Sequence, residues 1–147
     1  MNALIVALGA LLLNVATATV YTACSSEYGE VQSVTVTNCD ASPCVLKVNT
    51  KPEISITFKS HVDSKDLKVR IYGVIGGVPL PFPGPQGSAC EGSGIACPLK
   101  KDEVYTYRNS IDVKDSYPRI PVTVKYTLLD ENSNQVVCVE IPSKIEA

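Results

Sequence analysis

Few side chains in this 147-residue sequence are suited to acid–base, nucleophilic or metal chemistry. The single histidine, His61, lies in the polar stretch 59–63, where a solvated loop residue is a better interpretation than a catalytic base. Adjacent carboxylates occur at Asp102-Glu103 and Asp130-Glu131, and we expect such loop pairs to face solvent. No glycine-rich phosphate-binding motif precedes a helical pattern. Because no nucleophile, base and orienting group come together, we expect neither enzyme activity nor a cofactor.

Cysteine is the residue type with the most chemistry to offer in this chain. The count of six is even, which suits a disulfide framework, although six cysteines allow 15 pairings. A zinc site has little support, because Cys39 and Cys44 are separated by four residues and no second pair with matching spacing follows. We therefore expect no metal, while the pairing stays open at this point. The six are Cys24, Cys39, Cys44, Cys90, Cys97 and Cys138.

The N-terminal segment indicates the compartment in which these cysteines are placed. Residues 3–13 form an unbroken apolar run, which suits the hydrophobic region of a signal peptide. It is too short to span a bilayer, which needs about 20 apolar residues. Asn14 ends the run, and Ala16-Thr17-Ala18 supplies small residues for cleavage, although no Lys or Arg precedes it. We predict a signal peptide over residues 1–18, with a buried N-terminal helix as the alternative, and a secreted, extracellular product with oxidised cysteines.

Composition limits the remaining classes of function. A hydrophobic content of 45% with 19% charged residues excludes a disordered polymer. The length after cleavage, residues 19–147, fits a single domain. The net charge is −2 and no run of Lys and Arg is present, so we expect no nucleic-acid partner.

The mature chain alternates apolar and polar residues with a period of two. Four segments show the alternation clearly, at 54–58, 68–72, 122–128 and 137–141. This is the pattern of strands with one buried face. Shorter candidates bring the total to about seven strands, rich in Val, Ile, Thr and Tyr. These shorter candidates are 31–37, 44–48 and 104–109.

Turn residues separate these segments, and no segment carries an amphipathic helical stripe. About seven short antiparallel strands predict an all-β fold, an immunoglobulin-like β-sandwich. The chain has no Trp, so it lacks the core residue of an antibody-type domain.

The proline-rich segment 76–85 is the most unusual part of the chain. Its four prolines exclude a central strand and favour an extended, polyproline-like loop. Docking to SH3 or WW domains fits a cytosolic protein better than a secreted one. A stiff loop around Phe82 would hold one wall of a pocket at low entropic cost.

Motifs spread over the mature chain resemble those of one family. They include 77–83 (GVPLPFP), 93–98 (SGIACP), 113–118 (VKDSYP) and 138–142 (CVEIP), together with Lys101-Asp102 and 105–107 (YTY). Together they resemble the ML (lipid-recognition) domain family, which includes Niemann-Pick type C2 proteins and the mite group 2 allergens. The resemblance covers essentially the whole mature chain, and it favours an arthropod-type member.

The resemblance implies a disulfide pattern and a ligand site. The implied pairs are Cys24–Cys138, Cys39–Cys44 and Cys90–Cys97. Family members hold a lipid between their two sheets, and residues at the mouth of that pocket act as a gate. The gate residues carried over by motif are Phe82, Val113 and Tyr117. Tyr107 and Pro118, from the same motifs, complete the implied ligand-binding set. The rival interpretation is that Phe82 and Tyr117 only plug one end of the core.

The function implied by the resemblance is carriage of a hydrophobic small molecule, either a sterol such as cholesterol or a fatty acid or semiochemical lipid. A lipid-accepting membrane protein is an implied partner, and we expect a monomer. The alternative is an innate-recognition or adhesion domain that binds glycolipid or protein through cationic rim residues such as Lys100 and Lys101. Two positions depart from vertebrate members, since Tyr126 and Val139 stand where those have Trp. No Asn-x-Ser/Thr sequon is present, so a glycan-dependent lysosomal route is not expected.

Overall fold

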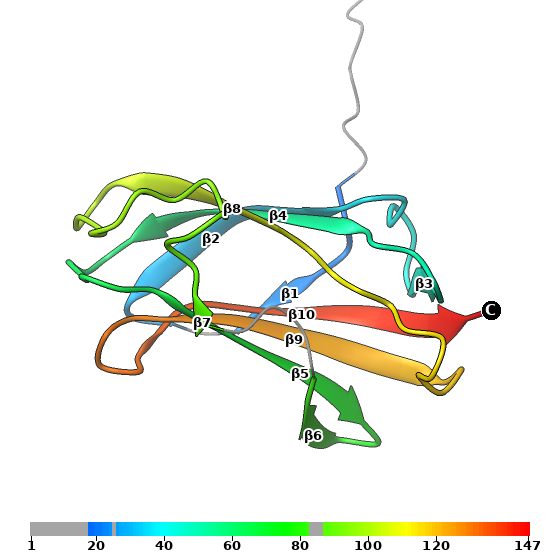
Figure 1. Cartoon of the computed structure of the whole chain (residues 1–147). Coiled ribbons are helices and arrows are strands. Elements are labelled where there is room, and N and C mark those ends of the chain that lie inside the picture. The colour runs from blue at the N-terminus through cyan, green and yellow to red at the C-terminus, as the bar shows by residue number, and fades with distance from the viewer. Residues whose placement is uncertain (1–17, 25, 83–86) are drawn as a thin grey trace, which may run out of the picture.

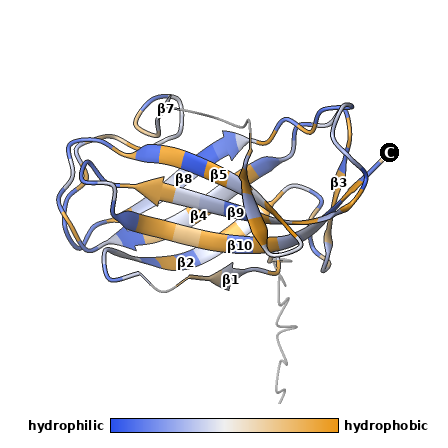
Figure 2. Cartoon of the chain, turned by 90° about the horizontal axis from the view of Figure 1, so that it is seen from below, coloured by the Kyte–Doolittle hydropathy of each residue, from blue (hydrophilic) through white to orange (hydrophobic). Residues whose placement is uncertain are grey.

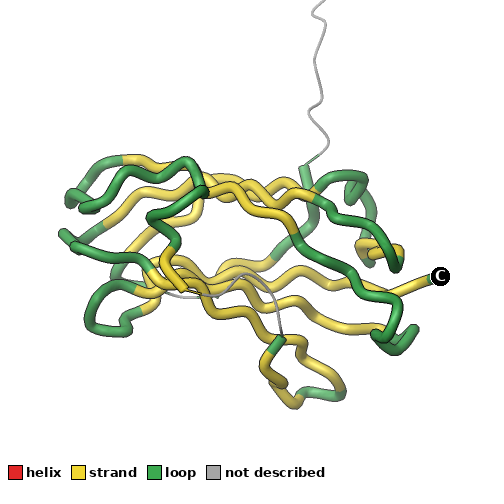
Figure 3. The backbone as a smooth tube through the Cα atoms, in the orientation of Figure 1, coloured by secondary structure: helices red, strands yellow, loops and turns green. Residues whose placement is uncertain are grey.

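The computed structural model describes residues 18–24, 26–82 and 87–147, and these residues form ten strands and no helix. The predicted signal peptide therefore lies, apart from Ala18, outside the described residues. No helix in the described part of the chain is long and apolar enough to cross a membrane. Figure 3 shows the strands in two layers, with the connecting loops gathered mainly at the two ends.

The larger layer is a seven-stranded sheet. Its strands are β1 (Thr22–Ala23), β3 (Cys44–Lys47), β5 (Lys68–Ile75), β6 (Val78–Pro81), β7 (Gly87–Ser88), β9 (Pro121–Leu129) and β10 (Gln135–Glu146). The order across the sheet is β1-β10-β9-β5-β6, with β3 paired to β10 and β7 paired to β5. The pairs are antiparallel except for β3 with β10, which is parallel.

The second layer is a three-stranded antiparallel sheet that faces the first (Figure 1). Its order is β2-β4-β8, so β8 forms one edge. The strands are β2 (Gly29–Val36), β4 (Glu53–Ser60) and β8 (Val104–Ser110). The prediction of an all-β sandwich is confirmed, and each of the seven expected segments is a strand. The three additional strands, β1, β6 and β7, are short.

The proline-rich segment differs from its prediction as a loop, because residues 78–81 form the edge strand β6 against β5. An edge strand needs hydrogen bonds on one side only, and proline is tolerated there. The backbone N–H of Phe82 donates to the carbonyl oxygen of Ile71 (2.9 Å). Since pairing positions alternate along an antiparallel strand, Pro79 and Pro81 fall where no donor to β5 is needed.

The buried core is built from the apolar residues that alternate with polar ones along the strands. Along β4, Ile54, Ile56 and Phe58 are fully buried, and along β9 the same holds for Tyr126 and Leu128. Figure 2 shows polar and apolar bands alternating along β5, whereas β10 is apolar over most of its length. Strand β10 is central in its sheet, and four successive residues, 136–139, are buried there.

The three implied disulfides are present in the structure. They are Cys24–Cys138, Cys39–Cys44 and Cys90–Cys97, and no cysteine is free. The start of the domain is also fixed: the buried Thr19 hydroxyl donates to the carbonyl oxygen of Cys39 and accepts from the N–H of Val36, both at 2.8 Å. Thr19, which directly follows the predicted signal peptide, is therefore fixed to the body of the domain.

Candidate functional site

Two aromatic rings meet at one edge of the sandwich. Phe82 directly follows β6, and Tyr117 lies in the loop between β8 and β9. Their ring centroids are 5.2 Å apart with the planes inclined at 57°, and both side chains are partly buried. The Phe82 ring lies beside Gly73 of β5, where an added Cβ would be 3.9 Å from its Cδ2 atom. Phe82 and Tyr117 therefore come together as the resemblance implies, although they are 35 positions apart in the sequence.

The Tyr117 hydroxyl has an unusual environment. Its oxygen is buried and has no hydrogen-bond partner among the described residues. Burial raises the pKa of this phenol, and the charge of Asp112 adds to the effect. A buried hydroxyl without a partner is uncommon in folded proteins. This oxygen is therefore available to a polar group of a bound molecule.

Arg119 holds the loop that carries Tyr117. The sequence motifs did not predict this role. Its guanidinium donates to the carbonyl oxygens of Asp115 (2.6 Å) and Tyr117 (2.9 Å), and to the Asp115 carboxylate (2.9 Å). The i, i+4 spacing of opposite charges is the one sequence signal for this contact, and it is weak outside a helix. Pro118, between the clamped residues, is exposed.

Val113 lies deeper than the two rings. Its side chain is fully buried, and its backbone exchanges hydrogen bonds with the turn before β4: its N–H donates to Thr50, and its carbonyl accepts from Asn49. The structure thus places Val113 in the core beneath the loop, Phe82 and Tyr117 at the edge, and Pro118 at the surface.

A second aromatic pair lies inside the sandwich. Tyr107 of β8 and Tyr126 of β9 come from opposite sheets, are fully buried, and have ring centroids 5.6 Å apart. Their hydroxyl oxygens are 2.5 Å apart, and the Asn109 side-chain amide donates to Tyr107 (3.0 Å). Burial is the main cause that raises the pKa of both phenols. Tyr126 was noted in the sequence only as a departure from vertebrate members, not as a site residue.

The space between the sheets is nearly closed. A void of about 10 Å³ is found there, large enough for about one water molecule. Pockets for small organic ligands are usually about 300–1,000 Å³. A lipid would fit at this void only if the sheets moved apart. The void is lined by Val36, Cys44, Leu46, Ile111, Val124, Ile141 and Ser143.

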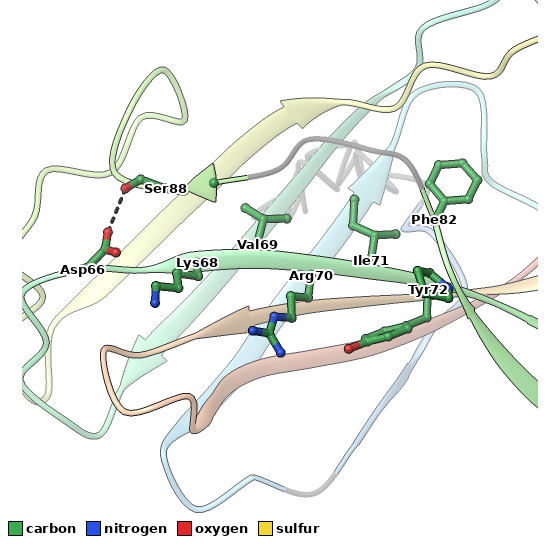
Figure 4. A pocket seen from close by; sticks show the side chains of 10 residues that line it. Asp66, Lys68, Val69, Arg70, Ile71, Tyr72, Phe82 and Ser88 are labelled. Carbon is green, nitrogen blue, oxygen red and sulfur yellow. Dashed lines mark hydrogen bonds between the residues drawn. The ribbon is translucent and has the colours of Figure 1, made fainter.

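A larger cavity of about 630 Å³ lies along strand β5 and includes Phe82 in its lining. Figure 4 shows that Val69, Ile71 and Phe82 point to one side of β5. The polar side chains Lys68, Arg70 and Tyr72 point to the other side, and the Ser88 hydroxyl donates to Asp66 (2.8 Å). Val69 and Ile71 are buried, so the apolar side of this cavity leads directly to the core.

The polar residues considered for catalysis have structural positions. The His61 ring lies 3.3 Å from the carbonyl oxygen of Glu27, in the turn after β4. Asp130 corrects the expectation that loop carboxylates face solvent, because it is buried. Its carboxylate accepts from the N–H groups of Asn132 and Asn134 and from the Asn134 side chain, which closes the β9–β10 turn.

Comparisons with known proteins agree with the expected family. A protein-family model described as ML domain (E1_DerP2_DerF2) matches residues 18–145. The chain is 37% identical over 124 residues to NPC intracellular cholesterol transporter 2 of Bos taurus, covering 84% of this chain and 83% of that protein. It is 38% identical over 125 residues to NPC intracellular cholesterol transporter 2 homolog a of Drosophila melanogaster, covering 84% of each.

A solved structure shows the same arrangement of strands. The Niemann-Pick type C2 protein from Japanese carpenter ant superposes with a TM-score of 0.82 at 28% identity, covering 86% of this chain and 99% of that one. The two relatives above are named as transporters, and the expectation that this chain is not an enzyme is confirmed by that similarity.

Proposed function

This chain belongs to the ML domain family, and from that premise we propose that it is a secreted carrier of a sterol or fatty acid. The ligand would lie between the two sheets and enter at the edge marked by Phe82 and Tyr117. The relatives named as cholesterol transporters support the ligand class. Three disulfides support an oxidising, extracellular compartment.

The observation that carries this proposal is the Phe82–Tyr117 pair with its unpartnered hydroxyl. Leaving a buried hydroxyl unpaired costs about 1–3 kcal/mol, and no described residue removes that cost. A ligand oxygen at the mouth would remove it. The Phe82 ring that contacts Tyr117 also lines the cavity along β5 together with Ile71, and these apolar side chains offer surface to a hydrocarbon body.

Opening of the sandwich is constrained at both ends. Backbone hydrogen bonds between Ser64 and Leu99 (3.1 and 2.7 Å) tie one pair of loops, and the bridge between Thr50 and Val113 ties another. Strands β5 and β8 belong to different sheets, so no ladder closes the stretch between these ties. Separation there would break side-chain packing and the Tyr107–Tyr126 hydrogen bond, while every strand pair would stay intact.

Burial of apolar ligand surface supplies enough free energy for binding, and no covalent chemistry is needed. A sterol or acyl chain that buries ~400 Å² of apolar surface gains on the order of 10 kcal/mol before association costs. The remainder is enough for micromolar or tighter binding. Release to a lipid-accepting membrane protein would complete the transport role.

Ligand uptake by delipidated protein tests the proposal. We expect dissociation constants in the micromolar range or below for cholesterol or hexadecanoic acid, measured side by side by calorimetry. Absence of binding to both would overturn the carrier function and favour an interaction domain with a filled core.

The gate is tested with Phe82→Ala and Tyr117→Ala. If Phe82 contacts ligand, its loss should weaken binding by ~2–4 kcal/mol, as for truncated aromatic hot spots, with little change in the thermal midpoint. The matched control is Tyr28→Ala, directly before β2 and away from this cavity, and its loss should leave binding unchanged. Unaltered binding with a collapsed midpoint in Phe82→Ala would instead identify a core plug.

A further inference from the structure

The two interior tyrosines form a polar contact where the surroundings are otherwise apolar. Tyr107 lies beside Ile56 in one sheet, and Tyr126 lies between Ile71 and Val139 in the other. Both tyrosines are fully buried, and their hydroxyl oxygens are 2.5 Å apart. We refer to Tyr107 and Tyr126 as the tyrosine pair.

Counting protons shows that the tyrosine pair is incompletely satisfied. Each phenol carries one proton to donate, and only one proton can lie between the two oxygens. Asn109 contributes its own proton to Tyr107, so it donates and does not accept. One phenolic proton therefore has no acceptor among the described residues. Because burial raises the pKa of both groups, neither loses its proton at physiological pH.

The tyrosine pair lies on the path that a ligand would take from the mouth. Phe82 is hydrogen-bonded to Ile71 of β5, and Ile71 pairs with Tyr126 of β9. In the larger sheet, Tyr126 is thus one strand further in than Ile71 and two further than Phe82. Tyr107 approaches it from β8, the edge strand of the facing sheet. A lipid that passes Phe82 and separates the sheets reaches both hydroxyls.

We propose that the tyrosine pair binds a second oxygen on the ligand, so that the preferred lipid carries a hydroxyl or keto group at the end that enters first. The proposal rests on the carrier function above and names its ligand class: an elongated lipid with a polar head at the mouth and a neutral oxygen at the inner end. Such an oxygen accepts the spare phenolic proton. A plain hydrocarbon end would leave that proton unpaired, and sites with buried polar groups discriminate against ligands that cannot pair with them.

Two matched ligand pairs test the proposal on the full delipidated protein. Cholesterol is compared with 25-hydroxycholesterol, and hexadecanoic acid with 16-hydroxyhexadecanoic acid. Within each pair the head is the same and one oxygen is added at the opposite end. The two arms also distinguish a sterol from a fatty acid as the source of that oxygen.

The measured quantity is the ratio of the two dissociation constants in wild type, divided by the same ratio in a variant. The cost of removing the added hydroxyl from water is common to both proteins and cancels. In the double variant Tyr107→Phe/Tyr126→Phe, which keeps both rings and removes the spare proton, the preference for the oxygenated member should fall about five- to tenfold in at least one arm. A single variant is not sufficient, because the remaining phenol keeps one unpaired proton. The control Tyr28→Phe, directly before β2 at the edge of the facing sheet opposite to β8, should keep the wild-type preference.

The outcomes separate this inference from the function on which it rests. If lipids bind but the double variant keeps the wild-type ratio in both arms, the tyrosine pair is a structural tie and the inference is wrong. If neither member of either pair binds to wild type, the carrier function itself fails. An unfolding midpoint of the double variant within a few degrees of wild type verifies that the comparison is made on folded protein.

Discussion

Buried polar side chains fall into two groups in this protein. Thr19 and Asp130 have partners within the chain, and each fixes a turn or a terminus. Tyr117 and the tyrosine pair are incompletely satisfied, and they lie along the path proposed for the ligand. Buried polar groups in native proteins are normally paired. Residues that lack partners in the ligand-free fold are therefore the ones that a ligand would complete.

The tyrosine pair predicts a specific loss of stability at alkaline pH. Both folded pKa values lie above the ordinary value of 10.0 because of burial. Below pH 10 the phenols are protonated in the folded and unfolded states alike. Above pH 10 the unfolded phenols ionise while the folded ones do not, so the free energy of unfolding should fall as pH rises.

Urea denaturation at pH 8, 9, 10 and 10.5 measures this effect. The double variant Tyr107→Phe/Tyr126→Phe should lose less stability between pH 9 and 10.5 than wild type, because two of the titrating groups are gone. An equal loss in the two proteins would show that other tyrosines or lysines cause the alkaline instability.

At the scale of elements, the sandwich is tightly closed along the side where β2 faces β10. The ladder between β9 and β10 has an irregularity between Gln135 and Val137, and the intervening Val136 is fully buried. An added Cβ on Gly29, at the start of β2, would overlap the carbonyl oxygen of Val136. Glycine is needed there because two backbones approach closely, which is a recognised use of glycine in strands.

Replacing Gly29 by Ala should therefore be strongly destabilising. The new methyl group meets backbone that cannot rotate away, and we expect a loss of about 3 kcal/mol in the free energy of unfolding. Thr35→Ala, at an exposed position of the same strand, should change it by less than about 0.5 kcal/mol. Urea denaturation checks both, and a loss below about 1 kcal/mol for Gly29→Ala would mean that β2 moves away from β10 at little cost.

At the scale of the whole molecule, one disulfide joins distant parts of the chain and two close short loops. None of them links β5 to β8. Cys24–Cys138 links residues 114 positions apart, next to the pairing of β1 with β10. Cys39–Cys44 and Cys90–Cys97 close short loops of separation 5 and 7. The covalent framework therefore stabilises the fold while leaving the proposed entrance free.

The disulfides should differ in their contribution to stability. In the chain-entropy model, the stabilisation grows with the length of the loop that is closed. Cys24→Ser/Cys138→Ser should cost about 5 kcal/mol, and Cys39→Ser/Cys44→Ser about 2 kcal/mol. Chemical denaturation of each double variant measures the difference, and equal losses would rule out loop length as the controlling factor.

The mature product also has an expected chemical form. Secreted protein should begin at Thr19, run as a monomer, contain no free thiol and carry no N-linked glycan. Intact mass before and after glycosidase treatment, with thiol titration and sedimentation, checks these points. A glycosidase-dependent mass shift, or an N-terminus upstream of residue 18, would contradict this form.

The sequence by itself determined the features that depend on local order. The alternation of apolar and polar residues placed the seven main strands, and the motifs from 77–83 to 138–142 identified the family and, through it, the cysteine pairs. These features were predictable because the side-chain period of a strand is a local property. The motif resemblance also predicts that Phe82 and Tyr117 belong to one site.

The tertiary structure alone decided which faces and edges meet. The alternation of apolar and polar residues predicts that Tyr107 and Tyr126 point inward. It does not predict that their hydroxyl groups meet from opposite sheets. The alternation also does not show three other features of the fold. Residues 78–81 form an edge strand, β3 pairs in parallel with β10, and Asp130 is buried. The meeting of the two tyrosines and the pairing of β3 with β10 depend on contacts between segments far apart in the sequence. Such contacts leave no periodic signal in the residues that make them. Strand β6 and Asp130 have partners close by in the sequence, but an alternation pattern does not show those hydrogen bonds either.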